Sequence, residues 1–190
     1  VKLTTNGTGS ATVVNDAGLN FAASTVGGNL VATATTDNIT QNRALIITGT
    51  SYFTTSANDA RITLDNKKNA FSGTVTLNTA GSSAYADIDG GTTALNIGAS
   101  SVGGNLYIRS GNASGITDSG TVTVGGNLLA TTDANSGVIN LGTLAVDGTV
   151  ALTTNGSGNA TLVNDAGLDF AASTVGGNLV ATATTGNMTD

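Results

Sequence analysis

Val26-Gly27-Gly28-Asn29-Leu30 is the stretch that decides the fold, because the same five residues return at 102–106, 124–128 and 175–179. The first, second and fourth copies are almost evenly spaced along the chain. Around the outer two copies the likeness is longer: residues 1–41 return as residues 150–190, with 33 of 41 positions identical. The chain therefore carries a 149-residue repeat, itself two diverged copies of about 75 residues.

Short β-branched stretches alternate apolar residues with Thr, Ser or Asn, which is the period-two pattern of a half-buried strand. Gly-Gly, Asn-Gly and Asp-Gly pairs separate these stretches and favour turns. No segment keeps the apolar spacing of a helix, and Thr, Asn and Gly are poor helix formers. We expect strands at 30–34, 44–48, 62–64, 75–77, 94–97, 106–108, 122–124, 138–141 and 150–152.

The strand-like stretches follow one another in the manner of a coil. They begin near Asn29, Thr50, Thr74, Asn105, Asn127, Thr149 and Asn178, and the widest gaps follow Thr74 and Thr149. This predicts an all-β fold, a parallel β-helix with about 22–31 residues per turn and about eight turns, each buried against its neighbours. We expect residues 1–190 to form a single continuous segment of a larger repeat protein, with 1–41 equivalent to 150–190.

The recurring string has a structural interpretation. Its glycine pairs would form corners too tight for a Cβ atom, and its Asn residues would open the next strand. Equivalent Asn side chains on stacked turns can form a hydrogen-bonded ladder. We assign to turns and ladders Gly27, Gly28, Asn29, Gly103, Gly104, Asn105, Gly125, Gly126, Asn127, Gly176, Gly177 and Asn178.

The composition excludes several classes of site. The chain has no His, Cys or Glu, so a Ser-His-Asp triad, a thiolate nucleophile and the usual structural zinc site are ruled out. Six Lys and Arg residues oppose 12 Asp residues, for a net charge of −6, which argues against a nucleic-acid partner. No apolar run reaches the ~18 residues of a membrane-spanning helix. We expect no cofactor, no nucleic-acid partner and no transmembrane segment.

Asp87 and Asp89 are candidates for catalysis or metal binding. They flank Ile88, so both carboxylates would lie on the same face of a strand. A polysaccharide-acting enzyme would need them in a groove beside a basic residue, and Ca²⁺ would need about six to eight oxygen ligands. The matching stretches in the other copies begin at Val13 and Leu162, so we expect a local variation of a solvent-facing turn and no enzyme.

Arg61, Lys67 and Lys68 form a basic cluster. A solvated loop is the simple interpretation, and a contact point for an acidic glycan or a neighbouring molecule is the alternative. The Thr-x-Thr stretches are too irregularly spaced to favour the flat Thr array of an ice-binding face.

Several strings resemble the repeat region of filamentous haemagglutinin-like exoproteins, which are bacterial surface proteins secreted by the two-partner route that act as adhesins. These strings are 24–30, 38–41, 44–50 and 94–98. The resemblance covers essentially the whole chain. It implies a right-handed parallel β-helix on the cell surface or outside the cell. It implies no receptor-binding residues, because the repeat does not fix them.

We therefore predict the structural shaft of a bacterial extracellular adhesin, a rigid rod that presents a surface for attachment. Its partners would be neighbouring turns, copies of itself end to end, or a host or cell-surface glycan or protein. The alternative is a subunit of a self-assembling extracellular filament or sheath. A polysaccharide-acting β-helix enzyme is the minor alternative.

Overall fold

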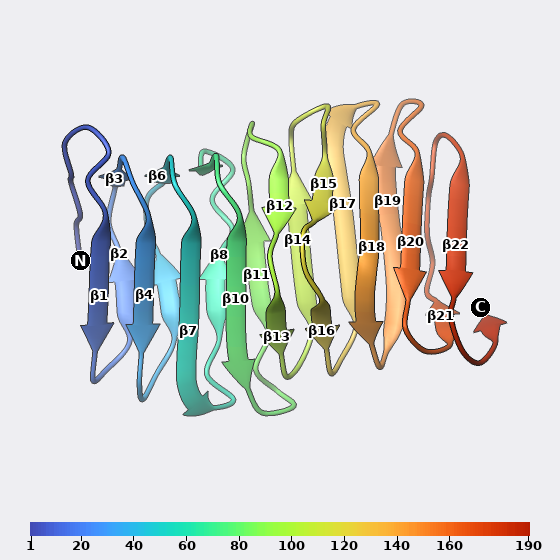
Figure 1. The fold of residues 1–190 in the computed structure, drawn as a ribbon, viewed down its shortest axis with the longest axis horizontal. Coiled ribbons are helices and arrows are strands. Elements are labelled where there is room, and N and C mark those ends of the chain that lie inside the picture. Colours follow the sequence, from blue (N-terminus) through green and yellow to red (C-terminus); the bar gives the residue numbers. More distant parts are fainter.

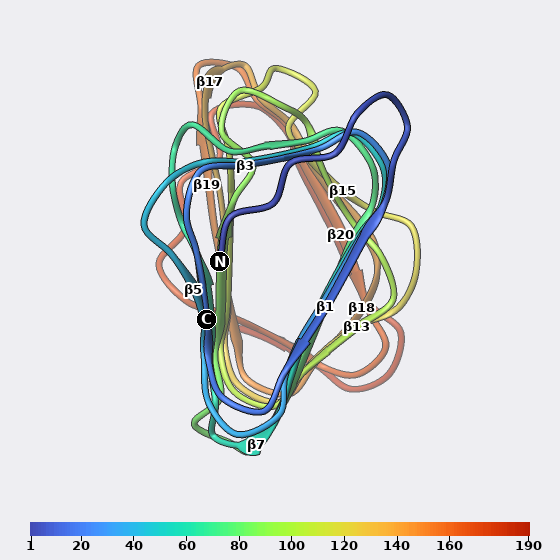
Figure 2. The same cartoon turned by 90° about the vertical axis from the view of Figure 1, so that its left-hand side faces the viewer.

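The chain is a coil of parallel strands. The computed structural model describes residues 1–190, except for the side chain of Asn135, and it contains no helix within this described part. The strands lie side by side along the long axis in the order of the sequence (Figure 1). Viewed along that axis, the backbone traces a roughly triangular outline (Figure 2). The predicted all-β parallel coil is confirmed.

Three sheets form the sides of the coil over the described residues. The nine-stranded sheet has the order β2 (Leu19–Phe21), β5 (Ile39–Gln41), β8 (Ile62–Leu64), β11 (Ala86–Asp89), β14 (Leu106–Ser110), β17 (Leu128–Asn135), β19 (Thr149–Asn155), β21 (Leu168–Phe170) and β23 (Met188–Thr189). The eleven-stranded sheet contains β1 (Ala11–Asn15), β4 (Leu30–Ala34), β7 (Ser51–Asn58), β10 (Val75–Ala80), β12 (Leu95–Ile97), β13 (Ser100–Val102), β15 (Ile116–Asp118), β16 (Val122–Val124), β18 (Ile139–Val146), β20 (Ala160–Asn164) and β22 (Leu179–Ala183). The three-stranded sheet contains β3 (Ser24–Val26), β6 (Leu45–Ile47) and β9 (Ala70–Phe71).

Residues paired on neighbouring turns are 19 to 24 positions apart, as for Ala11 with Leu30 and Ser51 with Val75. The nine strands of one sheet mark eight successive turns among the described residues, which confirms the expected number. At about 4.8 Å per turn, the coil is about 40 Å long.

The two longest predicted turns are wrong. The longer of them joins Thr74 to Asn105, but these residues precede β10 and β14, which belong to different sheets. Val75 pairs instead with Ile97, which shows where the next turn returns to the same side. The wide gap after Thr149 likewise crosses from β19 to β22, in another sheet. The alternation of apolar residues with Thr marks where a strand begins, but it does not mark the side of the coil on which that strand lies.

The 149-residue repeat spans seven whole turns. Leu19 in β2 and Leu168 in β21 are equivalent, and seven steps separate these two strands in the nine-stranded sheet. The half-repeat therefore spans about three and a half turns. As a result, Leu30 begins a strand of the eleven-stranded sheet, whereas Leu106 begins a strand of the nine-stranded sheet. Successive half-repeats alternate between two sides of the coil.

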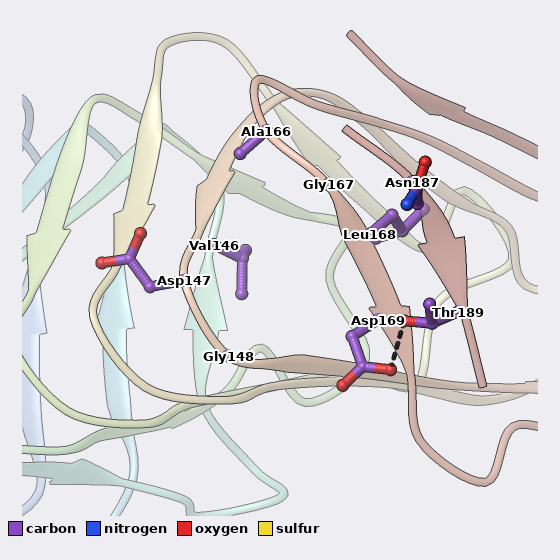
Figure 3. A pocket seen from close by; sticks show the side chains of 9 residues that line it. All are labelled: Val146, Asp147, Gly148, Ala166, Gly167, Leu168, Asp169, Asn187 and Thr189. Carbon is purple, nitrogen blue, oxygen red and sulfur yellow. Dashed lines mark hydrogen bonds between the residues drawn. The ribbon is translucent and has the colours of Figure 1, made fainter. Parts of the chain in front are cut away.

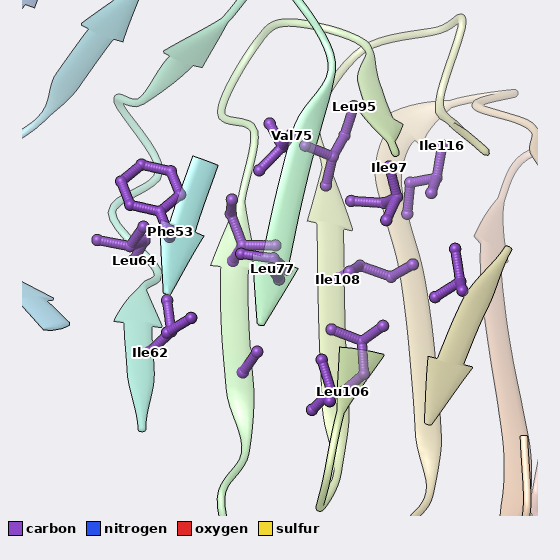
Figure 4. Close-up of a cluster of buried hydrophobic side chains, with 14 of the residues drawn as sticks. Phe53, Ile62, Leu64, Val75, Leu77, Leu95, Ile97, Leu106, Ile108 and Ile116 are labelled. Carbon is purple, nitrogen blue, oxygen red and sulfur yellow. The ribbon is translucent and has the colours of Figure 1, made fainter. Parts of the chain in front are cut away.

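The core is an apolar column that runs along the axis, in which side chains from facing strands interleave (Figure 4). Inward and outward residues alternate, so Leu30–Ala34 buries three side chains and turns Val31 to the surface. Phe21, Phe53 and Phe71 come from the three different sheets. Their rings meet edge to face, with centroids 6.4 and 6.1 Å apart, a favourable arrangement for aromatic pairs. Each turn thus depends on its neighbours for burial.

Candidate functional site

The four Val-Gly-Gly-Asn-Leu strings lie at corners of the coil, and they occupy two different corners. The strings at 26–30 and 175–179 lead into β4 and β22 of the eleven-stranded sheet. Those at 102–106 and 124–128 lead into β14 and β17 of the nine-stranded sheet. One local sequence therefore builds both corners.

The glycine pairs occupy places where consecutive turns approach each other closely. A Cβ atom on Gly103 would lie 2.5 Å from the carbonyl oxygen of Gly81, and one on Gly104 would lie 2.8 Å from that of Ala84. Real Cβ atoms do not come so close to backbone atoms, so a side chain here would push the turns apart. The same conflict with the preceding turn occurs at Gly27, Gly28, Gly125, Gly126, Gly176 and Gly177.

The Asn residues of the strings tie each turn to the next. In the first three strings the carboxamide oxygen accepts a hydrogen bond from a backbone amide one turn further on, so the ladder runs from side chain to main chain. The pairs are Asn29 with Thr50 (2.9 Å), Asn105 with Asn127 (2.8 Å) and Asn127 with Thr149 (2.9 Å). Asn178 donates its own amide to Oδ1 of Asn159, at 2.7 Å.

The two candidate acids lie on β11 in different environments. Asp87 is half-buried and accepts two hydrogen bonds from the Arg109 guanidinium of the next turn, at 2.7 and 3.2 Å. Asp89 is 3% exposed, and its Oδ1 accepts a 2.7 Å hydrogen bond from the backbone amide of Gly91. The expected solvent-facing turn is therefore wrong for this pair, because Asp87 lies within a strand and Asp89 is buried where that strand ends. Gly91 makes the following turn possible with a φ of +59°.

Burial and neighbouring charges shift the pKa values of Asp89 and Arg109. Burial raises the pKa of Asp89, although the Gly91 amide and the positive charges of Arg109 and Lys67 oppose the rise. For Arg109, burial alone would lower the pKa, but the hydrogen bond and the charge of Asp87 raise it. Arg109 therefore stays positively charged and holds Asp87 in place. No group of three His, Cys, Asp or Glu side chains in the described part of the chain could hold a metal ion.

The basic residues lie at opposite ends of β8. Arg61 precedes this strand, and its guanidinium carbon lies 5.0 Å from the ring centroid of Tyr85. Lys67 and Lys68 follow the strand in an exposed turn. There Oδ1 of Asn66 accepts a 3.0 Å hydrogen bond from the backbone amide of Lys68. The predicted basic cluster is thus divided. The sequence analysis did not single out Tyr85, whose position beside Arg61 depends on the strand register.

An open hollow of about 260 Å³ lies where β18 leads into β19 and faces β21 and β23 (Figure 3). Val146 and Leu168 contribute apolar side chains, and Thr189 donates a hydrogen bond to Asp169 at 2.9 Å. A second hollow of about 290 Å³ is its copy seven turns away. The copy is lined by Gly18, Leu19, Asn20, Asp37, Asn38 and Thr40.

Comparisons with known proteins identify the repeat unit. The chain matches a family described as repeats of unknown function (DUF5649) over residues 8–78, 83–141 and 157–190. The starts of these three stretches are almost evenly spaced, at the period of the half-repeat. No curated protein and no solved structure matches the chain. Among the described residues, none forms a helix long and apolar enough to cross a membrane.

Proposed function

The chain belongs to the family of repeats of unknown function (DUF5649), and, taking this repeat as the unit of construction, we propose that it is a length of structural shaft. The shaft would be part of a bacterial extracellular adhesin and would hold an attachment surface away from the cell. Its location on the surface or outside the cell follows from the resemblance to filamentous haemagglutinin-like exoproteins, and it belongs to the same proposal.

One observation carries this proposal: the 149-residue repeat corresponds to seven whole turns. A further copy would therefore lengthen the coil along its axis, and each of its residues would lie on the same side of the coil as the equivalent residue of the first copy. Repeat proteins of this kind gain length in proportion to the number of repeats, because each unit contacts only its neighbours. Seven turns correspond to about 34 Å of added reach.

The contacts between successive turns would also make the coil stiff, as a spacer must be. The side chains of Asn29, Asn105 and Asn127 form hydrogen bonds from one turn to the next, and the apolar column runs along the axis. Bending the rod would separate turns that share these contacts. A stiff rod would hold the attachment surface at a distance from the cell that equals the length of the rod.

The test uses the protein in the cell that makes it, with a copy of residues 1–149 inserted ahead of Val1. Antibodies against the chain should label intact cells. The label on the inserted variant should lie about 34 Å further from the cell surface, and attachment should persist. Label confined to the cell interior would overturn the proposal. So would label on free filaments that are not joined to cells, because that result would favour the filament subunit.

A further inference from the structure

Charged and aromatic side chains gather on one part of the outer face of the nine-stranded sheet. We call Arg61, Tyr85, Asp87, Tyr107 and Arg109 the aromatic band. The Arg61 guanidinium stacks on the Tyr85 ring, and the two tyrosine rings meet edge to face with centroids 6.1 Å apart. Asp87 and Arg109 form a two-point ion pair beside them. The band holds two of the three Tyr and two of the three Arg residues of the chain.

The internal repeats provide a comparison for the band. The strand pair β11–β14 is equivalent to β1–β4 and β20–β22, because each joins an Ala to a Leu at the same register position. These pairs are Ala86 with Leu106, Ala11 with Leu30, and Ala160 with Leu179. The three copies therefore align residue by residue.

The copies share their inward residues and differ in their outward ones. Ile88 of the band's copy points inward and corresponds to Val13 and Leu162, which are also apolar. The match expected from the sequence, which set Val13 and Leu162 against Asp87, is therefore wrong by one residue. The outward positions hold Ser, Asn, Thr or Val in the other two copies. Tyr85 replaces Ser10 and Asn159, Asp87 replaces Thr12 and Thr161, Tyr107 replaces Val31 and Val180, and Arg109 replaces Thr33 and Thr182. The fold is built twice without the band, so packing of the core does not require it.

The chemistry of the band matches a ligand with apolar faces and many hydroxyl groups. Both tyrosine rings are half-buried, which fixes them while leaving part of each ring at the surface. The Tyr107 hydroxyl accepts a hydrogen bond from Asn105 at 3.0 Å, and its own proton remains available for donation. The ion pair supplies a planar donor and a planar acceptor side by side.

The band carries little net charge, because its two Arg residues face one Asp. The charges of Asp89 and Asp65, which lie outside the band, also act on Arg109. A polyanion would need an excess of positive charge, and the chain as a whole carries −6. A neutral ligand fits this balance better than a nucleic acid or an acidic glycan.

We propose that the aromatic band is a binding site for a neutral oligosaccharide that lies across β8, β11 and β14. The sugar rings would pack on Tyr85 and Tyr107, and their hydroxyl groups would bond to Asp87, Arg109 and Tyr107. This site is independent of the shaft proposal, because a rod without such a site would still act as a spacer.

The test titrates the chain with neutral hexasaccharides of glucose, galactose, mannose and N-acetylglucosamine, and follows the tyrosine ring signals by NMR. Tyr52 is the built-in control, because it lies on β7 of the other large sheet. At least one hexasaccharide should shift the signals of Tyr85 and Tyr107 and leave that of Tyr52 unchanged. Raising salt from 50 to 500 mM should change its affinity less than twofold, since a neutral ligand releases few counterions.

Tyr107→Val is the decisive variant, because it restores the residue that the other two copies carry. It should weaken binding at least tenfold while the far-UV circular dichroism stays unchanged, and Tyr52→Val should change binding less than twofold. The proposal is overturned if no hexasaccharide shifts the two signals at 10 mM. It is also overturned if both variants weaken binding equally, or if only a sulfated polysaccharide such as heparin binds.

Discussion

Oδ1 of Asn127 accepts a 2.9 Å hydrogen bond from the backbone amide of Thr149, one full turn further along the coil. Gly148, the residue before Thr149, leaves room for that oxygen, because a Cβ atom there would collide with it. The Asn and the Gly of consecutive turns therefore form a unit. The same unit joins Asn29 to Gly49, Asn105 to Gly126 and Asn159 to Gly177.

Asn127→Ala should lower the free energy of unfolding by about 0.5–1.5 kcal/mol, the net value of one hydrogen bond. The measurement is urea unfolding followed by circular dichroism. Asn140→Ala is the matched control, because Asn140 is exposed on β18 and its side chain makes no hydrogen bond with the described residues. Equal effects of the two substitutions would contradict the ladder.

Gly103→Ala should destabilise the coil by about 1–3 kcal/mol, which is typical of a side chain forced into a filled space. The added Cβ would meet the Gly81 carbonyl oxygen at 2.5 Å. At Gly142 the nearest atom would be 3.9 Å away, so Gly142→Ala should be neutral or slightly stabilising. Thermal unfolding of both variants checks this, and a stable Gly103→Ala protein would show that the corners can spread apart.

Phe53→Ala should cost about 3–5 kcal/mol, because it removes a fully buried ring and leaves a cavity between the three sheets. Tyr52 is the adjacent control, since it is 45% exposed, and Tyr52→Ala should change stability by no more than about 0.5 kcal/mol. Chemical unfolding compares the two. If they behave alike, the inward and outward assignment on β7 is incorrect.

Asp89→Asn should stabilise the chain at pH 7. Burial raises the folded-state pKa of Asp89, so its ionised form is disfavoured by folding whenever the pH lies above that pKa. As the pH falls through the folded-state pKa towards the ordinary value of 3.8, the wild-type carboxyl becomes protonated and the penalty disappears. The stability advantage of the variant should therefore shrink on acidification. An advantage that does not change with pH would point to a cause other than charge.

The strand positions and the long repeat could be predicted from the sequence because they depend on local pattern. The nine predicted stretches all fall within or overlap observed strands, from Leu30–Ala34 to Thr149–Asn155. The turn length could not be predicted in the same way. The same Val-Gly-Gly-Asn-Leu string ends at Leu30 and at Leu106. Nothing in the local sequence indicates that these two residues lie on different sides of the coil. That difference arises because the half-repeat contains a half-integral number of turns.

The candidate site could be predicted only in part. Alternation placed Asp87 and Asp89 on one strand, but the burial of Asp89 depends on the fold of the turn that contains Gly91. The pairing of Asp87 with Arg109 joins residues one turn apart. It becomes visible only once the register of β11 with β14 is known, and the same holds for the two tyrosines.

The most direct test of the central claim is the length of the rod. The chain and a version with residues 1–149 duplicated ahead of Val1 should be imaged by cryo-electron microscopy at several dilutions, so that end-to-end association is recognised. Seven added turns predict a rod that is about 34 Å longer and equally wide at every dilution. A duplicated chain that is no longer than the original, or that doubles in width, would contradict a coil in which the repeat is a unit of length.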